Sequence, residues 1–213
     1  MHFLSPLLEN YIAEHSEAEP PLLTELTRET HLKVIQPRML TGHFQGRVLS
    51  LLSKLINPKN ILEIGTYTGY SAICLAEGLQ KDGELHTIEI NEELHEMQRR
   101  YFDKSGHGDQ IIQHTGDALN IIPSLDIDFD LVFIDAQKVN YDDYFETVIA
   151  KTKSGSIILS DNVLWSGKVI EAIDASDKAT ASLVEYNKKL KNDPRVETVI
   201  LPIRDGLTFC RVR

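Results

Sequence analysis

Short apolar runs alternate with amphipathic segments along most of this chain. The apolar runs are rich in β-branched residues and are followed by Gly, Asp or Asn, which is typical of buried strands. The segments between them repeat apolar residues at helical spacing. The predicted strands are Asn60–Ile64, Leu85–Ile90, Ile111–Thr115, Leu131–Ile134 and Ser156–Ser160, and the predicted helices are Gln45–Ile56, Tyr70–Leu79, Glu92–Ser105, Tyr141–Thr152 and Ala179–Lys191. This alternation predicts an α/β fold with a doubly wound parallel sheet.

The two ends of the chain depart from this alternation. Val196–Leu201 and Leu207–Val212 read as strands joined by a turn, so we expect an antiparallel hairpin that adds a reversed strand to the sheet. Glu17–Pro21 predicts a break between two N-terminal helices, and Pro37–Gly42 predicts a loop. With 213 residues, we expect a single domain, in which residues 1–56 are a helical extension to a Rossmann-like core of residues 57–213.

The composition narrows the choice of partners and compartment. With a net charge of −10, the chain lacks the excess of basic residues that is typical of nucleic-acid-binding proteins. A local basic patch formed by folding would not be visible in the sequence. Cys74 and Cys210 lie in apolar patterns, so we expect buried thiols and a cytoplasmic location. No apolar run is long enough to span a membrane, and the first residues do not resemble a signal peptide.

Oxygen-bearing side chains follow two of the predicted strands. Asp135 directly follows the fourth strand, and Asp161 and Asn162 follow the fifth. Strand ends line the ligand crevice of an open parallel sheet, so neighbouring strands could bring these side chains together. Two carboxylates and an amide suit Mg²⁺, Mn²⁺ or Ca²⁺ better than Zn²⁺. Asp and Asn are common in the turns that follow strands, so neither Asp135 nor the Asp161–Asn162 pair alone indicates a metal. The two together, with Lys138 three residues after Asp135, favour a metal site.

A glycine-containing turn after the first strand indicates a second binding region. The turn holds Gly65 and Gly69 but lacks the third glycine of G-x-G-x-x-G, so a pyrophosphate-binding turn is poorly supported. Glu89 ends the second strand, where a carboxylate can accept hydrogen bonds from ribose hydroxyls. Asp117 and Ala118 follow the third strand and could contact an adenine amino group. The alternative is structural, because Glu89 and Asp117 could each cap the helix that follows.

Three runs of residues, taken together, resemble one known family. They are Glu63–Ser71, Asp135–Lys138 with Tyr141, and Asp161–Gly167. In this order and spacing they resemble the metal- and S-adenosylmethionine (SAM)-dependent O-methyltransferases of the catechol and caffeoyl-CoA type. Asp205–Thr208 also resembles the last hairpin of that family. The resemblance extends from about Met39 onward and implies the class I methyltransferase fold, whose parallel sheet carries a reversed C-terminal strand.

The resemblance implies a role for each matching residue. Asp135, Asp161 and Asn162 would ligate Mg²⁺, and Lys138 would be the general base beside Asp135. The residues expected around SAM are Glu63, Gly65, Tyr67 and Ser71 at the methionine portion, Glu89 at the ribose, Asp117 and Ala118 at the adenine, and also Met39 and Asp135. The residues expected around the acceptor are Met39, Lys138, Asn162 and Trp165.

Two departures from the family pattern limit what it implies. Gln137 stands where many relatives carry Asp, which leaves Asp135 and Lys138 unaffected. Residues before about Arg38 match poorly, so the resemblance implies the acceptor less securely than the rest of the site.

The implied function is Mg²⁺-dependent methyl transfer from SAM to a hydroxyl of a small aromatic diol, by an enzyme that is expected to be a homodimer. A second hypothesis is a transfer-RNA 5-hydroxyuridine O-methyltransferase, against which the acidic charge weighs. A third is a catalytically silent cofactor-binding module, against which the intact metal and base residues weigh. As an alternative to the general-base role, Lys138 could form a surface ion pair with Asp135 or Asp142.

Overall fold

The computed structural model describes residues 5–213, so residues 1–4 of the predicted N-terminal extension lie outside the described part. Its seven-stranded sheet has the order β3-β2-β1-β4-β5-β7-β6. The strands are β1 (Asn60–Ile64), β2 (Glu84–Glu89), β3 (Ile111–Thr115), β4 (Phe129–Ile134), β5 (Thr152–Asp161), β6 (Val196–Leu201) and β7 (Leu207–Val212). The first five strands pair in parallel, whereas β7 runs antiparallel to both β5 and β6. The predicted fold class and the reversed hairpin strand are confirmed.

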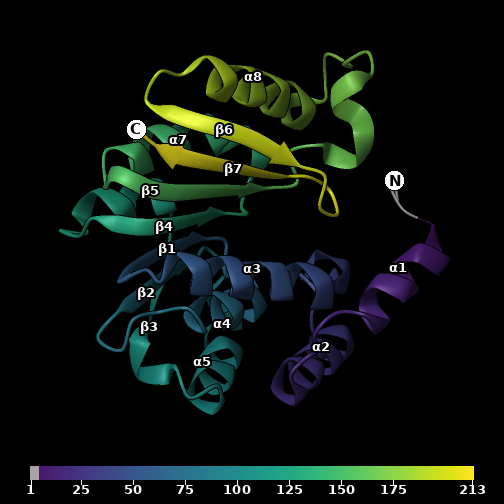
Figure 1. The fold of residues 1–213 in the computed structure, drawn as a ribbon, viewed down its shortest axis with the longest axis vertical. Helices are drawn as coiled ribbons and strands as arrows, with labels where there is room; N and C mark the ends of the chain where they lie inside the picture. Colours follow the sequence, from purple (N-terminus) through teal and green to yellow (C-terminus); the bar gives the residue numbers. More distant parts are fainter. Residues whose placement is uncertain (1–4) are drawn as a thin grey trace.

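Helices cover both faces of the sheet (Figure 1). The α-helices are α1 (Pro6–Glu14), α2 (Pro21–Lys33), α3 (His43–Ile56), α4 (Tyr70–Ala76), α5 (His95–Lys104), α6 (Ala118–Ile121), α7 (Tyr141–Ile149) and α8 (Lys178–Asn192). Short 3₁₀ turns lie at η1 (Pro37–Met39), η2 (Glu92–Leu94), η3 (Gly108–Gln110), η4 (Ile122–Ser124), η5 (Lys138–Asn140) and η6 (Trp165–Ile170). Helix α1 extends away from the body of the molecule in Figure 1.

The core has two apolar layers, one on each side of the sheet. On one side, Leu49 of α3 and Ile73 of α4 belong to the same buried cluster as Ile61 of β1. On the other side, Phe145 of α7 belongs to a cluster with Val132 of β4. The strands are apolar on both faces because each face is covered by helices.

Several predicted boundaries were wrong by part of a helical turn or more. The helix expected over Tyr141–Thr152 ends at Ile149, because Thr152 pairs with Phe129 as the first residue of β5. The helix expected over Tyr70–Leu79 ends at Ala76. The segment Glu92–Ser105 begins with a 3₁₀ turn, which the Asn91 side chain caps by accepting a hydrogen bond from the Glu93 N–H.

The sheet register brings three strand ends to one edge. Ile64 of β1 pairs with Ile134 of β4, and Ile134 pairs with Ser160 of β5. The residues that come next, Gly65, Asp135 and Asp161, therefore emerge side by side at the carboxyl ends of adjacent strands. This is the edge at which open α/β sheets bind ligands.

Candidate functional site

A cavity of about 1760 Å³ lies at the carboxyl ends of the parallel strands. Its walls include residues of α1, of the Arg38–Phe44 segment, of η5 and η6, and of the β6–β7 turn. Twelve of the thirteen predicted site residues line it: Met39, Gly65, Tyr67, Ser71, Glu89, Asp117, Ala118, Asp135, Lys138, Asp161, Asn162 and Trp165. The remaining one, Glu63, is buried in β1 behind the cavity wall.

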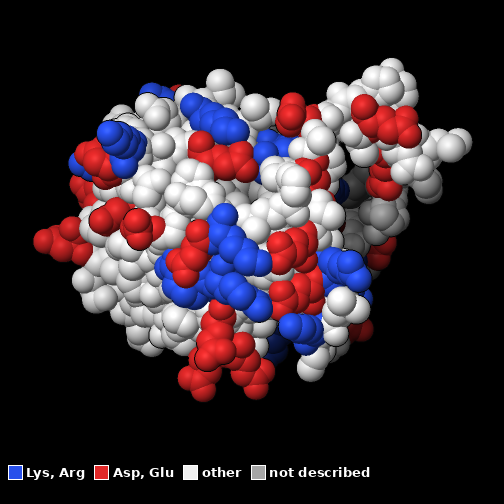
Figure 2. Space-filling view, turned by 90° about the horizontal axis from the view of Figure 1, so that it is seen from below, with Lys and Arg blue, Asp and Glu red and all other residues white. Residues whose placement is uncertain are grey.

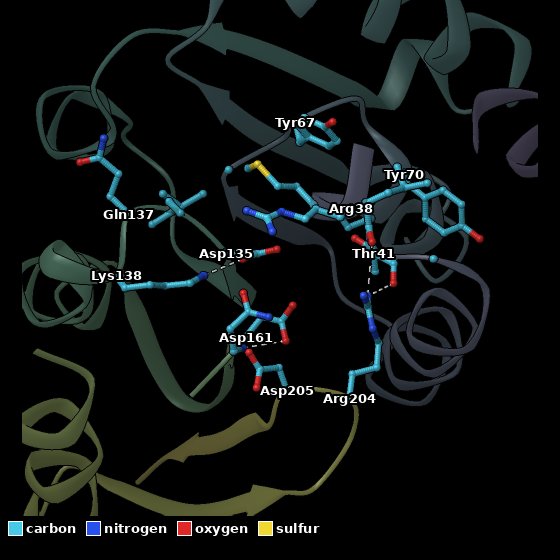
Figure 3. Close-up of a pocket in the computed structure, with 18 of the residues that line it drawn as sticks. Arg38, Thr41, Tyr67, Tyr70, Asp135, Gln137, Lys138, Asp161, Arg204 and Asp205 are labelled. Atoms are coloured by element: carbon cyan, nitrogen blue, oxygen red, sulfur yellow. Dashed lines mark hydrogen bonds and ion pairs between the residues drawn. The ribbon is translucent and has the colours of Figure 1, made fainter. Parts of the chain in front are cut away.

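The three predicted metal ligands line this cavity, and Figure 3 shows Asp135 and Asp161 close to each other in it. Asp161 is only 2% exposed, and Asp135 is partly buried beside it. Burial and the negative charge of Asp135 together raise the pKa of Asp161 to about 7, against the opposing effects of the Gln45 hydrogen bond and the charge of Lys138. Asn162 has a positive φ of 60°, a conformation that Asn tolerates better than most residues.

This donor set fits a hard divalent cation. Two carboxylates that disfavour each other's charge would both be stabilised by a cation between them. Within residues 5–213, no three His, Cys, Asp or Glu side chains are placed to hold a metal ion, so the amide of Asn162 is an essential part of the predicted set.

Lys138 points into the cavity rather than outward. Its Nζ lies 2.8 Å from Asp135 Oδ1 and 2.7 Å from the hydroxyl of Tyr141, and only 9% of its side chain is exposed. The Tyr141 hydroxyl in turn donates to the backbone carbonyl of Asp161 at 2.8 Å. The ion pair with Asp135 is therefore present but lies inside the site, whereas Asp142 pairs with Lys189 instead. In Figure 3, Gln137 points away from Asp135, in keeping with the prediction that this departure leaves Asp135 and Lys138 unaffected.

The turn after β1 depends on the lack of a side chain at Gly65. A Cβ there would lie 2.0 Å from the backbone oxygen of Asp135, and φ is +98°. Tyr67, also at positive φ, donates its N–H to Glu89 Oε2 at 2.7 Å. Glu89 Oε1 accepts from the N–H of Asn91, so this carboxylate holds the turn and also faces the cavity.

Asp117 caps a helix, which is its structural alternative, and it also lines the cavity. Its carboxylate accepts from the N–H of Leu119 and so caps α6. The same carboxylate contacts the side-chain amide of Asn120 at 3.3 Å.

Glu63 is fully buried in β1. Thr87 Oγ1 donates to its Oε2. Burial raises the pKa of Glu63 to about 8, against the opposing effect of the Ser71 and Thr87 hydroxyl groups.

Other residues of the site carry no local sequence signal. Thr41, Gln45 and Arg204 form hydrogen bonds around Asp161, although they lie far apart in the chain. Asn10 and Ala13 of α1 also line the cavity. Polar residues are common near the start of a helix and at the tip of a hairpin. Only the folded structure therefore shows that Thr41, Gln45 and Arg204 meet.

Comparisons with known proteins show the family. A family model described as O-methyltransferase matches residues 13–213. The chain belongs to this O-methyltransferase family. A caffeoyl-CoA O-methyltransferase from Petroselinum crispum is 39% identical to it over 220 residues, which cover 97% of this chain and 91% of that protein. Caffeoyl-CoA O-methyltransferase 5 from Nicotiana tabacum is 37% identical, with 97% of this chain and 91% of that protein covered.

Solved O-methyltransferases share the whole fold. TomG from Streptomyces achromogenes, which is involved in tomaymycin synthesis and was solved in complex with SAM, has a TM-score of 0.89 and 29% identity over 97% of this chain and 96% of its own. An O-methyltransferase from Bacillus cereus in complex with SAH has a TM-score of 0.91 and 28% identity over 97% of each chain. The family and the enzyme class predicted from the sequence, a SAM-dependent O-methyltransferase, are confirmed.

Within residues 5–213, the O-methyltransferase has no helix that is both long enough and apolar enough to cross a membrane. Both cysteines are free and buried, as predicted.

Proposed function

We propose that this O-methyltransferase moves the methyl group of SAM to a hydroxyl of a catechol-type acceptor and that it needs Mg²⁺ or a similar hard cation. One observation carries the proposal: Asp135, Asp161 and Asn162 line one cavity, with Asp135 and Asp161 at the ends of adjacent strands, and Lys138 lies beside Asp135. Two carboxylates and an amide can hold a hard cation that activates a diol, and the neighbouring amine can take the proton of the diol.

The donor is proposed to lie over the ends of β1, β2 and β3. Glu89 would hold the ribose, and Asp117 and Ala118 would hold the adenine. The methionine portion would lie against Gly65, Tyr67 and Ser71, with Glu63 buried behind Ser71. Met39 and Asp135 would also lie near the donor. The presence of SAM and SAH in structures with TM-scores of 0.89 and 0.91 supports this assignment. Bound there, SAM supplies an electrophilic methyl group.

Lys138 is proposed to take the proton of the attacking hydroxyl. A phenol with a pKa near 10 is mostly protonated at neutral pH and is then a weak nucleophile. A cation held by Asp135, Asp161 and Asn162 would favour the ionised oxygen. As a neutral amine, Lys138 would donate its two N–H groups to Asp135 and Tyr141. Its lone pair would then be free to take the proton of the substrate hydroxyl. Met39 and Trp165 would shape the pocket around the acceptor ring.

The transfer-RNA hypothesis is the weaker alternative. On the face shown in Figure 2, Lys and Arg lie beside Asp and Glu and do not form an unbroken basic surface. Arg100 pairs with Glu29 at 2.8 Å, and Lys104 pairs with Glu25 at 2.6 Å. Such pairing removes the free positive charge that phosphate binding needs.

The remaining features are part of the same proposal. The chain would be a single domain with residues 1–56 as a helical extension, a homodimer and a cytoplasmic enzyme. The caffeoyl-CoA relatives favour a small phenolic acceptor over a silent module.

An acceptor comparison tests the proposal. Labelled SAM and Mg²⁺ would be incubated with the enzyme and caffeate, unmodified tRNA or hydroxylated tRNA. We expect label in caffeate and none in either RNA. Label only in hydroxylated tRNA would support the alternative, and label in no acceptor, with SAM bound, would support the silent module.

A further inference from the structure

Gln45 connects the buried end of α3 to Asp161. It is 1% exposed, and its Nε2 donates to Asp161 Oδ2 at 2.7 Å. The N–H of Asn162 donates to the other carboxylate oxygen at 2.8 Å. The two donors hold the two oxygens of Asp161 and so restrict the carboxylate to one orientation.

Arg204 fixes which way the Gln45 amide faces. Its Nη1 lies 3.1 Å from Gln45 Oε1 and also donates to the backbone carbonyl of Thr41, as the dashed line in Figure 3 shows. A guanidinium group can only donate hydrogen bonds, so the amide oxygen must face it and the amide NH₂ must face Asp161. The reversed amide would place its oxygen against the carboxylate and its NH₂ against Arg204, which would break both contacts.

The three residues come from distant parts of the chain. Gln45 lies in the first turn of α3, Asp161 ends β5, and Arg204 lies in the β6–β7 turn. None of the contacts is needed to form the sheet, because the β5–β7 and β6–β7 ladders pair without them. Their common result is the orientation of Asp161.

We propose that Gln45 and Arg204 are positioning residues that hold Asp161 ready for the cation, with Arg204 acting through Gln45. This inference rests on the proposed function, because it assigns the purpose of the arrangement to the metal site. Residues that orient metal ligands from behind typically change metal affinity 10- to 100-fold when they are replaced.

Calorimetric titration of Mn²⁺ into SAH-saturated enzyme tests the proposal in the full chain. Gln45→Met keeps the side-chain length but removes both amide contacts, and we expect the Mn²⁺ Kd to rise at least about tenfold with the SAH Kd within about twofold. Ser53→Ala is the matched control, because Ser53 is a buried residue of the same helix that donates to the Leu75 carbonyl, away from the site. Ser53→Ala is expected to lower the Tm and leave the Mn²⁺ Kd unchanged.

A double-mutant cycle tests the order of action. Arg204→Met should weaken Mn²⁺ binding in the wild-type background and have little further effect in the Gln45→Met background, because its contact with Asp161 runs through that amide. Arg211→Met, an exposed change on the same hairpin, is the control and should not alter Mn²⁺ binding.

The possible outcomes separate this inference from the proposed function. Normal Mn²⁺ binding by Gln45→Met would overturn the positioning role while leaving the metal site intact. Additive effects of the two substitutions would overturn the action of Arg204 through Gln45. If the wild-type enzyme does not bind Mn²⁺ at all, the metal assignment and this inference both fail.

Discussion

Lys138 Nζ lies 2.8 Å from Asp135 Oδ1, with the Tyr141 hydroxyl 2.7 Å away as its second partner. The amine is therefore held beside a proposed metal ligand by two acceptors, and it is almost completely enclosed. A lysine that served only to neutralise a surface carboxylate would not need the buried hydroxyl of Tyr141 as a second partner.

Replacing Lys138 with Ala should remove the proposed base. We expect turnover to fall by about 10²- to 10⁴-fold, the usual contribution of general acid–base catalysis, with the SAM Kd within about twofold of wild type. Steady-state kinetics and calorimetry give the two values. Lys81→Ala, at an exposed position, is the control. Unchanged turnover in Lys138→Ala would refute the base assignment.

Asn162 allows the ligand role to be separated from the backbone role. Its φ of 60° suits Gly as well as Asn, so Asn162→Gly should keep the turn and remove the amide ligand. We expect weaker Mg²⁺ binding with little change in Tm. Asn162→Ala should also weaken Mg²⁺ binding, and it should cost about 1 kcal/mol more stability than Gly because Ala is strained at this φ. If Asn162→Gly bound Mg²⁺ as tightly as wild type, Asn162 would not be a ligand.

Glu63 should make the stability of the enzyme depend on pH. Its pKa is raised from the ordinary value of 4.5 to about 8 in the folded chain, so Glu63 ionises in the unfolded chain at a lower pH than in the folded chain. Folding then binds a proton, and this group lowers the free energy of unfolding progressively from about pH 4.5 to about pH 8. Each pKa unit corresponds to about 1.4 kcal/mol, so the loss should reach several kcal/mol.

The test is urea unfolding of wild type and Glu63→Gln across this pH range. The difference in unfolding free energy between them should increasingly favour Glu63→Gln as pH rises. Thr87→Val is a useful second variant, because it removes the hydroxyl that donates to Glu63 and should raise the pKa of Glu63 further. Parallel stability curves for wild type and Glu63→Gln would show that Glu63 is not protonated in the folded chain.

Gly65 should not tolerate a side chain. A Cβ at residue 65 would lie 2.0 Å from the Asp135 carbonyl, so Gly65→Ala must separate the ends of β1 and β4. We expect a loss of stability beyond the about 1–2 kcal/mol of positive-φ strain, together with weaker cation and SAM binding. Gly155→Ala is the matched control, because its φ of +94° is nearly the same and no atom lies within 4 Å of the added Cβ. Equal losses of stability in the two variants would show that contact with Asp135 has no effect.

Much of the fold and part of the site could be predicted because the relevant signals are local. The apolar strand runs, together with the Asp and Glu residues that follow them, predict both the sheet and the polar edge where Asp135 and Asp161 meet. Helix ends were less accurate, as at Ile149, because a β-branched segment near a chain reversal can continue a helix or begin a strand. The roles of Gln45 and Arg204 could not be predicted, because they depend on contacts between distant parts of the chain. Gln45 and Asp161 are separated by 116 positions, and Arg204 and Gln45 by 159.

The most direct test of the account is the rate of methyl transfer from labelled SAM to caffeate, measured in EDTA and again after Mg²⁺ is restored in excess. The account predicts that transfer stops in EDTA and returns with Mg²⁺, while SAM stays bound throughout. Transfer at the full rate in EDTA would contradict the central claim that a cation held by Asp135, Asp161 and Asn162 prepares the acceptor for methylation.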